Sequence, residues 1–237
     1  MSQEKSEAIV LRKVDFGETS AIVTFLTPER GKLACLAKGL KRKKSTMAGT
    51  LDTFNRVEAV FFWKDGRGVQ NLAEASVLET YAVLKQDLER VTHASFLLEI
   101  CLRAANENEA SHGMYARLAE ALDGYMTVEA TPRAWTALQA HGLLCETGHA
   151  PELTACADTG APPEAAQWFS FAHGLAEKIG DRRLSATMRT ALMEMAENET
   201  PPPADASDEA FSLLAGFASQ QLETDFRSIR VIRQMFD

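Results

Sequence analysis

The chain has 237 residues, of which 46% are hydrophobic and 24% are charged, and its formal net charge is −8. These values are ordinary for a globular protein and exclude a chain that is disordered throughout; the length suits one large domain or two small ones. No apolar run approaches the ~18 residues of a membrane span, and none near the start has signal-peptide character. We therefore expect a cytoplasmic protein that does not enter a membrane.

Charge is unevenly distributed along the chain. Residues 1–50 contain ten Lys and Arg against five Asp and Glu, whereas residues 51–237 contain 15 against 28. Such asymmetry predicts a segment that binds a polyanion and a separate acidic segment. The four cysteines are widely spaced and form no C-x-x-C pair, so we expect reduced thiols and no disulfide framework.

The first eighty residues have the pattern of short β-strands. The segments EAIVLRKVDF, AIVTFL, KLACLA and VEAVFFW are apolar and rich in β-branched side chains, and VQNLAEASVLET follows them. Turn-forming residues separate the strands, notably TPERG at 27–31 and KDGRG at 64–68. Several short strands with regular turns predict a small barrel or sandwich over residues 1–80.

From residue 81 onwards, apolar residues recur at helical spacing. Helices are predicted around residues 87–107, 113–126, 132–148, 184–199 and 207–223, and in the tail at 224–236. Pro132 suits a first helical turn, Gly148 suits a helix end, and Ser207 is expected to cap the helix after the proline-rich segment. The predicted fold class is α+β, with a β-rich domain at 1–80 and an α-helical domain at 81–237.

The segment KGLKRKKST, residues 38–46, is strongly basic and follows a predicted strand, so we expect a loop. Clustered cations repel one another unless an anion is present, and nucleic acid supplies one because each phosphate contact releases counterions. A solvated surface loop or a nuclear-localisation signal also fits this composition. The predicted DNA contacts are Lys38, Lys41, Arg42, Lys43 and Lys44 in the loop, with Arg12 and Lys13 in the first strand.

Three further features bear on function. Six aromatic residues lie in the β-rich domain; an OB-fold uses exposed rings to stack on bases, but we expect most of the six to be structural. Arg227, Arg230 and Arg233 form a stripe on the predicted last helix, open to DNA phosphate, an acidic partner segment or carboxylates of the same chain. No P-loop, dinucleotide-binding, zinc-protease or nucleophile-elbow motif occurs, so we expect no catalytic residues and no cofactor.

The order of these features resembles the RecO family of bacterial recombination mediators. The most specific elements are the opening AIVL, the segment GETSAIVTFLT, the GK after the turn, and AKG followed by basic residues and Ser45. The segments LLEICLR, AHGLLCETGHAPELTAC and FRSIRVIRQMF lie where the family has comparable segments, so the resemblance covers nearly the whole chain. It implies an N-terminal OB-fold barrel and a C-terminal helical domain.

The resemblance also implies a function. Members of the family bind single- and double-stranded DNA, anneal complementary strands, and cooperate with RecR and single-strand-binding protein so that RecA loads. They have no catalytic centre, and their basic DNA-contacting loop corresponds to residues 38–44 of this chain. In a bacterium such a protein is cytoplasmic and associated with the nucleoid. We therefore expect a DNA-repair mediator with DNA, RecR, single-strand-binding protein and, indirectly, RecA as partners.

One departure from the family concerns metal binding in the region of about residues 145–180. Many members carry a four-cysteine zinc module here, but in this chain Cys156 is present, Thr159 stands at the second cysteine position, and the later pair is missing from FSFAHGLAEKIGDRR. The other possible ligands, Cys145, His149 and His173, match no strong zinc spacing. We expect no bound metal.

The residues alone leave other functions open. An RNA-binding OB-fold protein would carry the same basic loop, and competition between matched RNA and DNA strands would distinguish it. An interaction scaffold would act through its acidic helical domain, and its binding to single-strand-binding protein would not need the loop. An enzyme would show nuclease or ATPase activity that a single carboxylate change abolishes.

Overall fold

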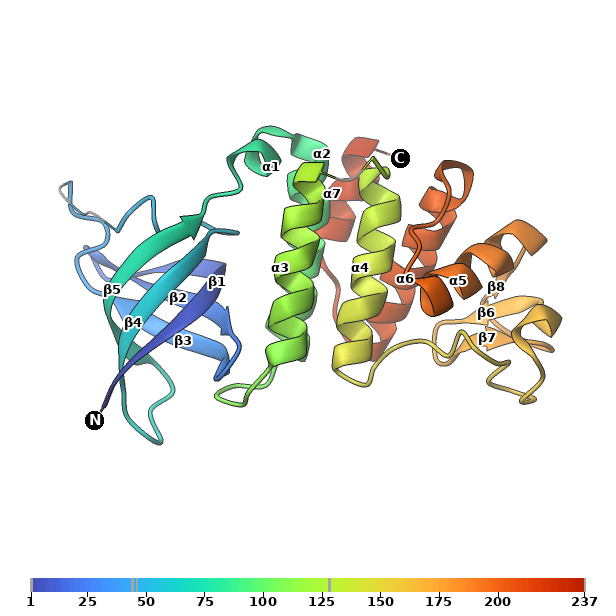
Figure 1. Ribbon diagram of the computed structural model, residues 1–237, viewed down its shortest axis with the longest axis horizontal. Coiled ribbons are helices and arrows are strands. Elements are labelled where there is room, and N and C mark those ends of the chain that lie inside the picture. The colour runs from blue at the N-terminus through green and yellow to red at the C-terminus, as the bar shows by residue number, and fades with distance from the viewer. Residues whose placement is uncertain (1, 44, 46, 128, 237) are drawn as a thin grey trace. The chain divides into compact units, whose positions relative to one another are not determined.

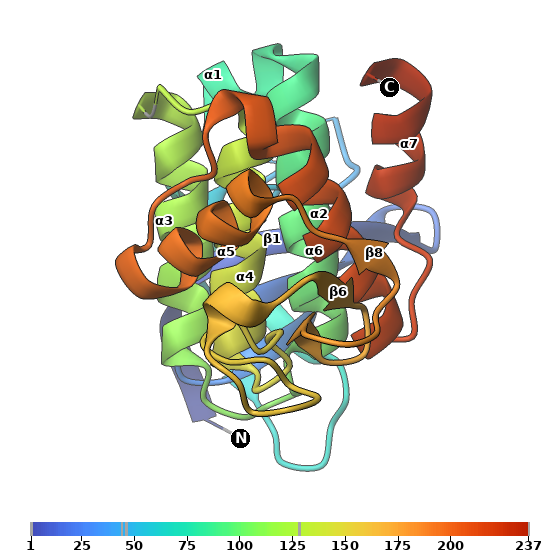
Figure 2. The same ribbon diagram turned by 90° about the vertical axis from the view of Figure 1, so that its right-hand side faces the viewer.

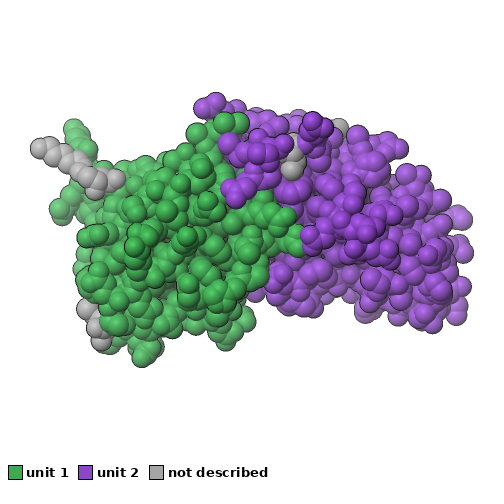
Figure 3. Space-filling model, viewed as in Figure 1, with its two compact units in different colours: residues 1–83, 105–122 green, residues 84–104, 123–237 purple. Residues whose placement is uncertain are grey.

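The computed structural model describes residues 2–43, 45, 47–127 and 129–236. The chain forms two compact units, coloured separately in Figure 3. The first unit consists of residues 1–83 and 105–122, and the second of residues 84–104 and 123–237. The β-rich segment therefore forms one unit with a later stretch of chain that includes the first turns of a helix.

A closed five-stranded barrel forms the body of the first unit (Figure 1). Its strands are β1 (Ser2–Phe16), β2 (Ser20–Thr27), β3 (Gly31–Ala37), β4 (Arg56–Trp63) and β5 (Gln70–Glu79). The strand order is β1-β2-β3-β5-β4, and β1 closes the barrel because it pairs with both β2 and β4. Among the described barrel strands, β3 and β5 form the one parallel pair. A closed five-stranded barrel of this kind is an OB-fold, which confirms the predicted fold.

The alternation of apolar residues along the strands explains the barrel core. In β2, β3 and β4 every second residue is buried, as expected for strands with one face against a core. The long connection between β3 and β4 adds Leu40 and Leu51 to the same core, where both are almost completely buried. These two residues therefore anchor the connection that contains the basic loop to the barrel core.

The second unit is mainly helical (Figure 2). The helices of the chain are α1 (Ala82–Gln86), α2 (Leu88–Ala104), α3 (His112–Thr127), α4 (Pro132–Glu146), α5 (Ala186–Asn198), α6 (Ser207–Gln221) and α7 (Arg227–Phe236). Helix α4 packs against α2 and α6, and α2 also packs against α7. Phe96 of α2 makes edge-on contacts with Phe211 and Phe226, which places aromatic rings at the centre of this packing. No described helix combines the length and the apolar character needed to cross a membrane.

Two local features differ from the sequence-based expectations. The region of about residues 145–180, where we expected no metal site, contains a three-stranded sheet of β6 (Trp168–Ser170), β7 (Gly174–Ala176) and β8 (Arg182–Arg183). The sequence did not predict this sheet, because strands of two or three residues are too short to show a period. Ser207 is the first residue of α6 and not its cap. The short 3₁₀ helix Ala204–Ala206 precedes it, and the Ser207 hydroxyl donates to the carbonyl of Ala204.

Candidate nucleic-acid interface

The basic loop begins directly after β3 and stays close to the barrel. The backbone N–H of Lys41 donates to the carbonyl oxygen of Thr19 in the β1–β2 turn at 2.9 Å, so the loop lies beside this turn. Arg42 lies over Gly39, whose positive φ of 70° reverses the chain. The described basic residues of the loop, Lys38, Lys41, Arg42 and Lys43, are all exposed. Lys44, also predicted to contact DNA, lies outside the described residues.

Two of the predicted DNA contacts are engaged in ion pairs. Lys13 Nζ lies 2.9 Å from Asp52 Oδ1, and Lys41 Nζ lies 2.7 Å from Asp15 Oδ2. Each pair connects β1 with the β3–β4 connection, so both hold this connection against the end of the first strand. Exposed ion pairs contribute about 0–1 kcal/mol each, which is enough to bias the position of a loop. Lys13 and Lys41 therefore have a structural role before any ligand is considered.

Four other predicted contacts differ from Lys13 and Lys41 in their charge pairing. Within the described part of the chain, the exposed cations Arg12, Lys38, Arg42 and Lys43 form no ion pair. All four lie on β1 or on the segment after β3, at the end of the barrel that carries the β1–β2 turn. We call this the open end. It concentrates positive charge that is not neutralised by the fold, which is the electrostatic requirement for binding phosphate.

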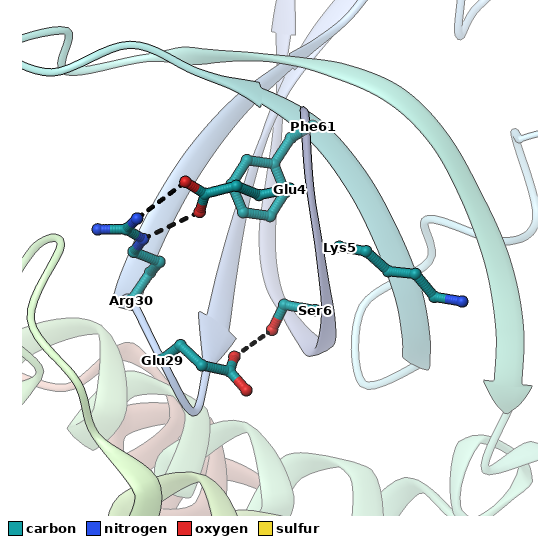
Figure 4. A pocket seen from close by; sticks show the side chains of 6 residues that line it. All are labelled: Glu4, Lys5, Ser6, Glu29, Arg30 and Phe61. Atoms are coloured by element: carbon teal, nitrogen blue, oxygen red, sulfur yellow. Dashed lines mark hydrogen bonds and ion pairs between the residues drawn. The ribbon is translucent and has the colours of Figure 1, made fainter. Parts of the chain in front are cut away.

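The opposite end of the barrel, at the β2–β3 turn, has compensated charges (Figure 4). Arg30 donates two hydrogen bonds to the Glu4 carboxylate, at 3.1 and 2.9 Å, and its guanidinium stacks 4.1 Å from the centre of the Trp63 ring. The hydroxyl of Ser6 donates to Glu29 at 2.6 Å. Lys5 projects away from this network and pairs with Glu58 instead. We call this the paired end.

Residues 105–115 cover part of the paired end. The N–H of Lys32 donates to the carbonyl oxygen of Asn106 at 3.0 Å, and the N–H of Ser111 donates to that of Pro28 at 2.7 Å. The hydroxyl of Tyr115 donates to Glu7 at 2.9 Å. Burial, together with this bond, raises the pKa of Tyr115 well above its ordinary value of 10.0. The paired end is thus a site of intramolecular contact.

The aromatic residues of the barrel are mostly structural, as predicted. Phe25, Phe54 and Phe61 are buried, and Trp63 is nearly so. Phe16 is different, because 54% of its surface is exposed at the end of β1. Its neighbour Val14, two residues earlier, is 42% exposed.

Helix α7 presents the predicted arginine stripe. Ile229 and Ile232 are buried, whereas the arginines lie on the exposed side. Arg230 Nε lies 3.5 Å from Asp225, so one member of the stripe has a carboxylate neighbour from the same chain. The exposed members of the stripe are Arg227, Arg230 and Arg233.

The region of the family's zinc module does not fit zinc. Cys156 is buried, and Thr159, at the position of the second cysteine, donates a hydrogen bond to Glu177 at 2.8 Å. Asp158 accepts hydrogen bonds from the backbone N–H of Glu177 and of the next residue, both at 2.9 Å. These bonds join the segment around Asp158 to the segment around Glu177, and the bonds from backbone N–H groups lower the pKa of Asp158. Hydrogen bonds therefore connect these two loops.

No other metal-binding group is present among the described side chains. No cluster of three or more His, Cys, Asp or Glu in these ranges is placed to hold a metal ion. Burial raises the pKa of Cys35 to about 12 and raises that of Cys101 further, so neither thiol forms a thiolate near neutral pH. The remaining possible ligands, Cys145, His149 and His173, are exposed.

The barrel, with its open end, and the helical region that follows define an OB-fold protein of the α+β class. The family model for Recombination protein O N terminal matches residues 1–81, and the model for Recombination protein O C terminal matches residues 85–231. The chain belongs to the recombination protein O family.

Curated relatives agree with this assignment. A DNA repair protein RecO from Myxococcus xanthus is 28% identical over 99% of both chains. Another, from Anaeromyxobacter dehalogenans (strain 2CP-1), is 31% identical over 68% of this chain and 63% of its own length. A third, from Exiguobacterium sibiricum, is 33% identical over 72% of this chain and 67% of its own length. The match to the Anaeromyxobacter protein thus spans less than two thirds of that relative, whereas the Myxococcus match is full-length.

Proposed function

We propose that the chain is a non-enzymatic DNA-binding mediator of recombinational repair, with the open end of its barrel as the DNA-binding surface. Membership of the recombination protein O family, whose curated members are named DNA repair protein RecO, gives the chain a role in DNA repair. The observation that carries the binding proposal is a group of exposed cations that form no ion pair among the described residues, namely Arg12, Lys38, Arg42 and Lys43.

Counterion release supplies the driving force. Each cation that contacts a phosphate displaces a condensed counterion from the nucleic acid, so binding is strong at low salt and weakens as salt rises. Lys13 and Lys41 are held by Asp52 and Asp15 and contribute less, because a phosphate must compete with a carboxylate already in place. The acidic segment at 51–237 repels DNA. These features together favour DNA at one end of the barrel.

The proposed activity is annealing of complementary single strands, together with assistance to RecA loading. Cationic surfaces lower the repulsion between two strands, and a binding surface that does not depend on sequence accepts any pair. RecR and single-strand-binding protein are the proposed protein partners, and the nucleoid is the proposed place of action. The exposed arginines of α7 offer a second cationic surface for DNA or for an acidic partner segment.

Strand annealing tests this proposal. Two complementary labelled oligonucleotides are mixed with the wild-type chain or with the double variant Arg42→Ala/Lys43→Ala, with and without single-strand-binding protein. We expect the wild type to accelerate annealing and the variant to lose most of this effect. Equal rates with and without the wild-type chain would contradict the proposal. Stronger binding of a matched RNA strand in competition would favour an RNA-binding protein instead.

A further inference from the structure

Phe16 is the one large aromatic side chain of the described barrel residues that is mainly exposed. It lies at the end of β1, opposite Ser20 of β2 and directly before Gly17 of the turn. The ring is 54% exposed. Exposure of a single apolar residue is common in soluble proteins, so the surroundings of this ring decide whether it has a function.

A β-bulge turns Phe16 outward. The pairing of β1 with β2 shifts between Val10 and Arg12, so that Leu11 is the extra residue. Val10 lies opposite Phe25 in the core, and simple alternation would therefore point residues 12, 14 and 16 inward as well. Because of the bulge they point outward. Bulges commonly re-aim side chains in this way.

The outward face at the open end combines apolar and basic residues. Val14 lies opposite Ile22, and Ile22 lies opposite Leu36, so a half-exposed apolar strip crosses β1, β2 and β3 beside Phe16. Arg12 lies on the same face two positions beyond Val14. Residues directly opposite on antiparallel strands share a face, so this strip is continuous.

Lys38 lies at the other edge of the strip. It directly follows Ala37, the β3 residue that pairs with Ala21. Two strand spacings therefore separate Lys38 from Phe16, which amounts to about 10 Å. Arg12 and Lys38 are both exposed, and neither forms an ion pair among the described residues. Arg12 lies four residues from Phe16 along β1, about 13 Å away, so the ring has one of these two cations along its own strand and the other across the hairpin.

The paired cations lie on the other side of the same hairpin. Lys13 is opposite Val23 and Asp15 is opposite Ala21, and both partners belong to the barrel core. Both residues stay exposed at the end of the barrel, and they are the ones that form ion pairs with the β3–β4 connection. The hairpin therefore uses one face to hold the loop and leaves the other face free for a ligand.

We propose that Phe16 is a base-stacking platform for single-stranded DNA, flanked by phosphate contacts from Arg12 and Lys38. This inference rests on the proposed function and names the residue that stacks on the bases at that site. A nucleic acid strand supplies flat apolar rings and phosphates together, which matches an exposed aromatic ring with exposed cations nearby. The charge of the surrounding surface favours this occupant over an apolar protein segment.

The test compares Phe16→Leu, which keeps an apolar side chain, with Phe16→Trp, which keeps an aromatic one. Affinity is measured by fluorescence anisotropy for a thymidine oligonucleotide, an abasic oligonucleotide of equal length and a duplex. We expect Phe16→Leu to weaken binding to the thymidine strand by roughly 5- to 150-fold, the range for loss of one stacked base. Binding to the abasic strand and the duplex stays within about twofold, and Phe16→Trp binds like the wild type.

The salt dependence separates stacking from charge. Phe16→Leu removes no cation, so the slope of log K against log salt stays that of the wild type, whereas Arg42→Ala/Lys43→Ala reduces it by about two. The matched control is Leu78→Ala, which removes an apolar side chain that is 43% exposed on β5. We expect no change in binding for this control and similar thermal unfolding for all variants.

The outcomes distinguish this inference from the proposed function. If the wild type does not bind single-stranded DNA, the proposed function fails. If it binds and Phe16→Leu binds equally well, only the stacking inference is overturned. An equal loss for the abasic and thymidine strands also overturns it, because the ring would then act without bases. Unchanged DNA binding with loss of a protein partner would make this face a protein-docking surface instead.

Discussion

The two ends of the barrel are built from the same strands but treat charge in opposite ways. At the paired end, Arg30 binds Glu4, Lys5 binds Glu58, and Glu29 accepts a hydrogen bond from Ser6. At the open end, Arg12, Lys38, Arg42 and Lys43 have no ion-pair partner among the described residues. Charges that are paired within the fold contribute to its stability. Unpaired cations lower the stability of the fold slightly through their mutual repulsion, and they are available to bind a ligand. The paired end therefore contributes to folding, and the open end is the surface that we propose for binding.

The largest effect expected at the paired end follows from a close backbone approach. Gly31 has a φ of 54°, and a Cβ there would lie 2.3 Å from the carbonyl oxygen of Glu109. Gly31→Ala combines an unfavourable backbone conformation with a clash against backbone, so we expect a loss of about 3 kcal/mol or more in unfolding free energy. Urea unfolding measures it.

Gly17 at the open end is the matched control. Its φ is 64°, but a Cβ there would meet no atom within 4 Å. We therefore expect Gly17→Ala to lower the unfolding free energy by about 1 kcal/mol, through the unfavourable backbone conformation alone. Similar losses for the two variants would show that the contact of residues 105–110 with the paired end contributes little to stability.

A smaller effect is expected from the Tyr115 hydroxyl. Tyr115→Phe removes the bond to Glu7, which contributes about 1 kcal/mol. The pKa of Tyr115 is raised in the folded chain, so the stabilisation is fully present below pH about 10, the ordinary pKa, and is lost as the pH rises above it. The stability difference between wild type and variant should hold from pH 7 to 9 and shrink at higher pH. A constant difference up to pH 12 would contradict this account.

Freeing a paired cation should improve DNA binding at the open end. Asp15→Asn removes the carboxylate partner of Lys41, so both the lost negative charge and the released ammonium group favour phosphate. We expect affinity for single-stranded DNA to rise by about two- to fivefold at low salt. The matched change at the paired end is Glu58→Gln, which removes the ion-pair partner of Lys5. We expect this variant to leave DNA binding unchanged. Equal gains from both variants would mean that overall charge, and not its location, controls affinity.

The smallest effect is expected from Glu18 in the β1–β2 turn. Glu18 is exposed next to the proposed DNA surface, where a carboxylate repels phosphate through solvent. Glu18→Gln should tighten binding by less than about twofold at low salt, with no effect at high salt because screening removes the repulsion. Weaker binding in this variant would indicate that Glu18 holds the hairpin in position.

The sequence predicted the architecture well because most signals were local. Apolar, β-branched runs bounded by turn residues predicted the strands of the barrel, and helical spacing predicted the long helices. The basic loop was evident from composition, and the family resemblance from the first 45 residues. The three-stranded sheet at residues 168–183 was missed because each of its strands is too short to show a period.

The site could be predicted only in part, because its details depend on contacts distant in sequence. Lys13 and Asp52 are 39 residues apart, and Lys41 and Asp15 are 26 apart, so composition alone could not separate these paired cations from the free ones. The orientation of Phe16 depends on the bulge between Val10 and Arg12, which reverses the alternation that the sequence suggests. Composition predicted where basic residues gather, and strand register determines which of them form ion pairs.

The most direct test of the central claim compares cations removed from the two ends. The slope of log K against log salt for a single-stranded oligonucleotide is measured for the wild type, for Arg42→Ala/Lys43→Ala at the open end and for Lys5→Ala/Arg30→Ala at the paired end. The account predicts that the slope falls in magnitude by about two for the first variant and is unchanged for the second. Equal slopes for the two variants would contradict it.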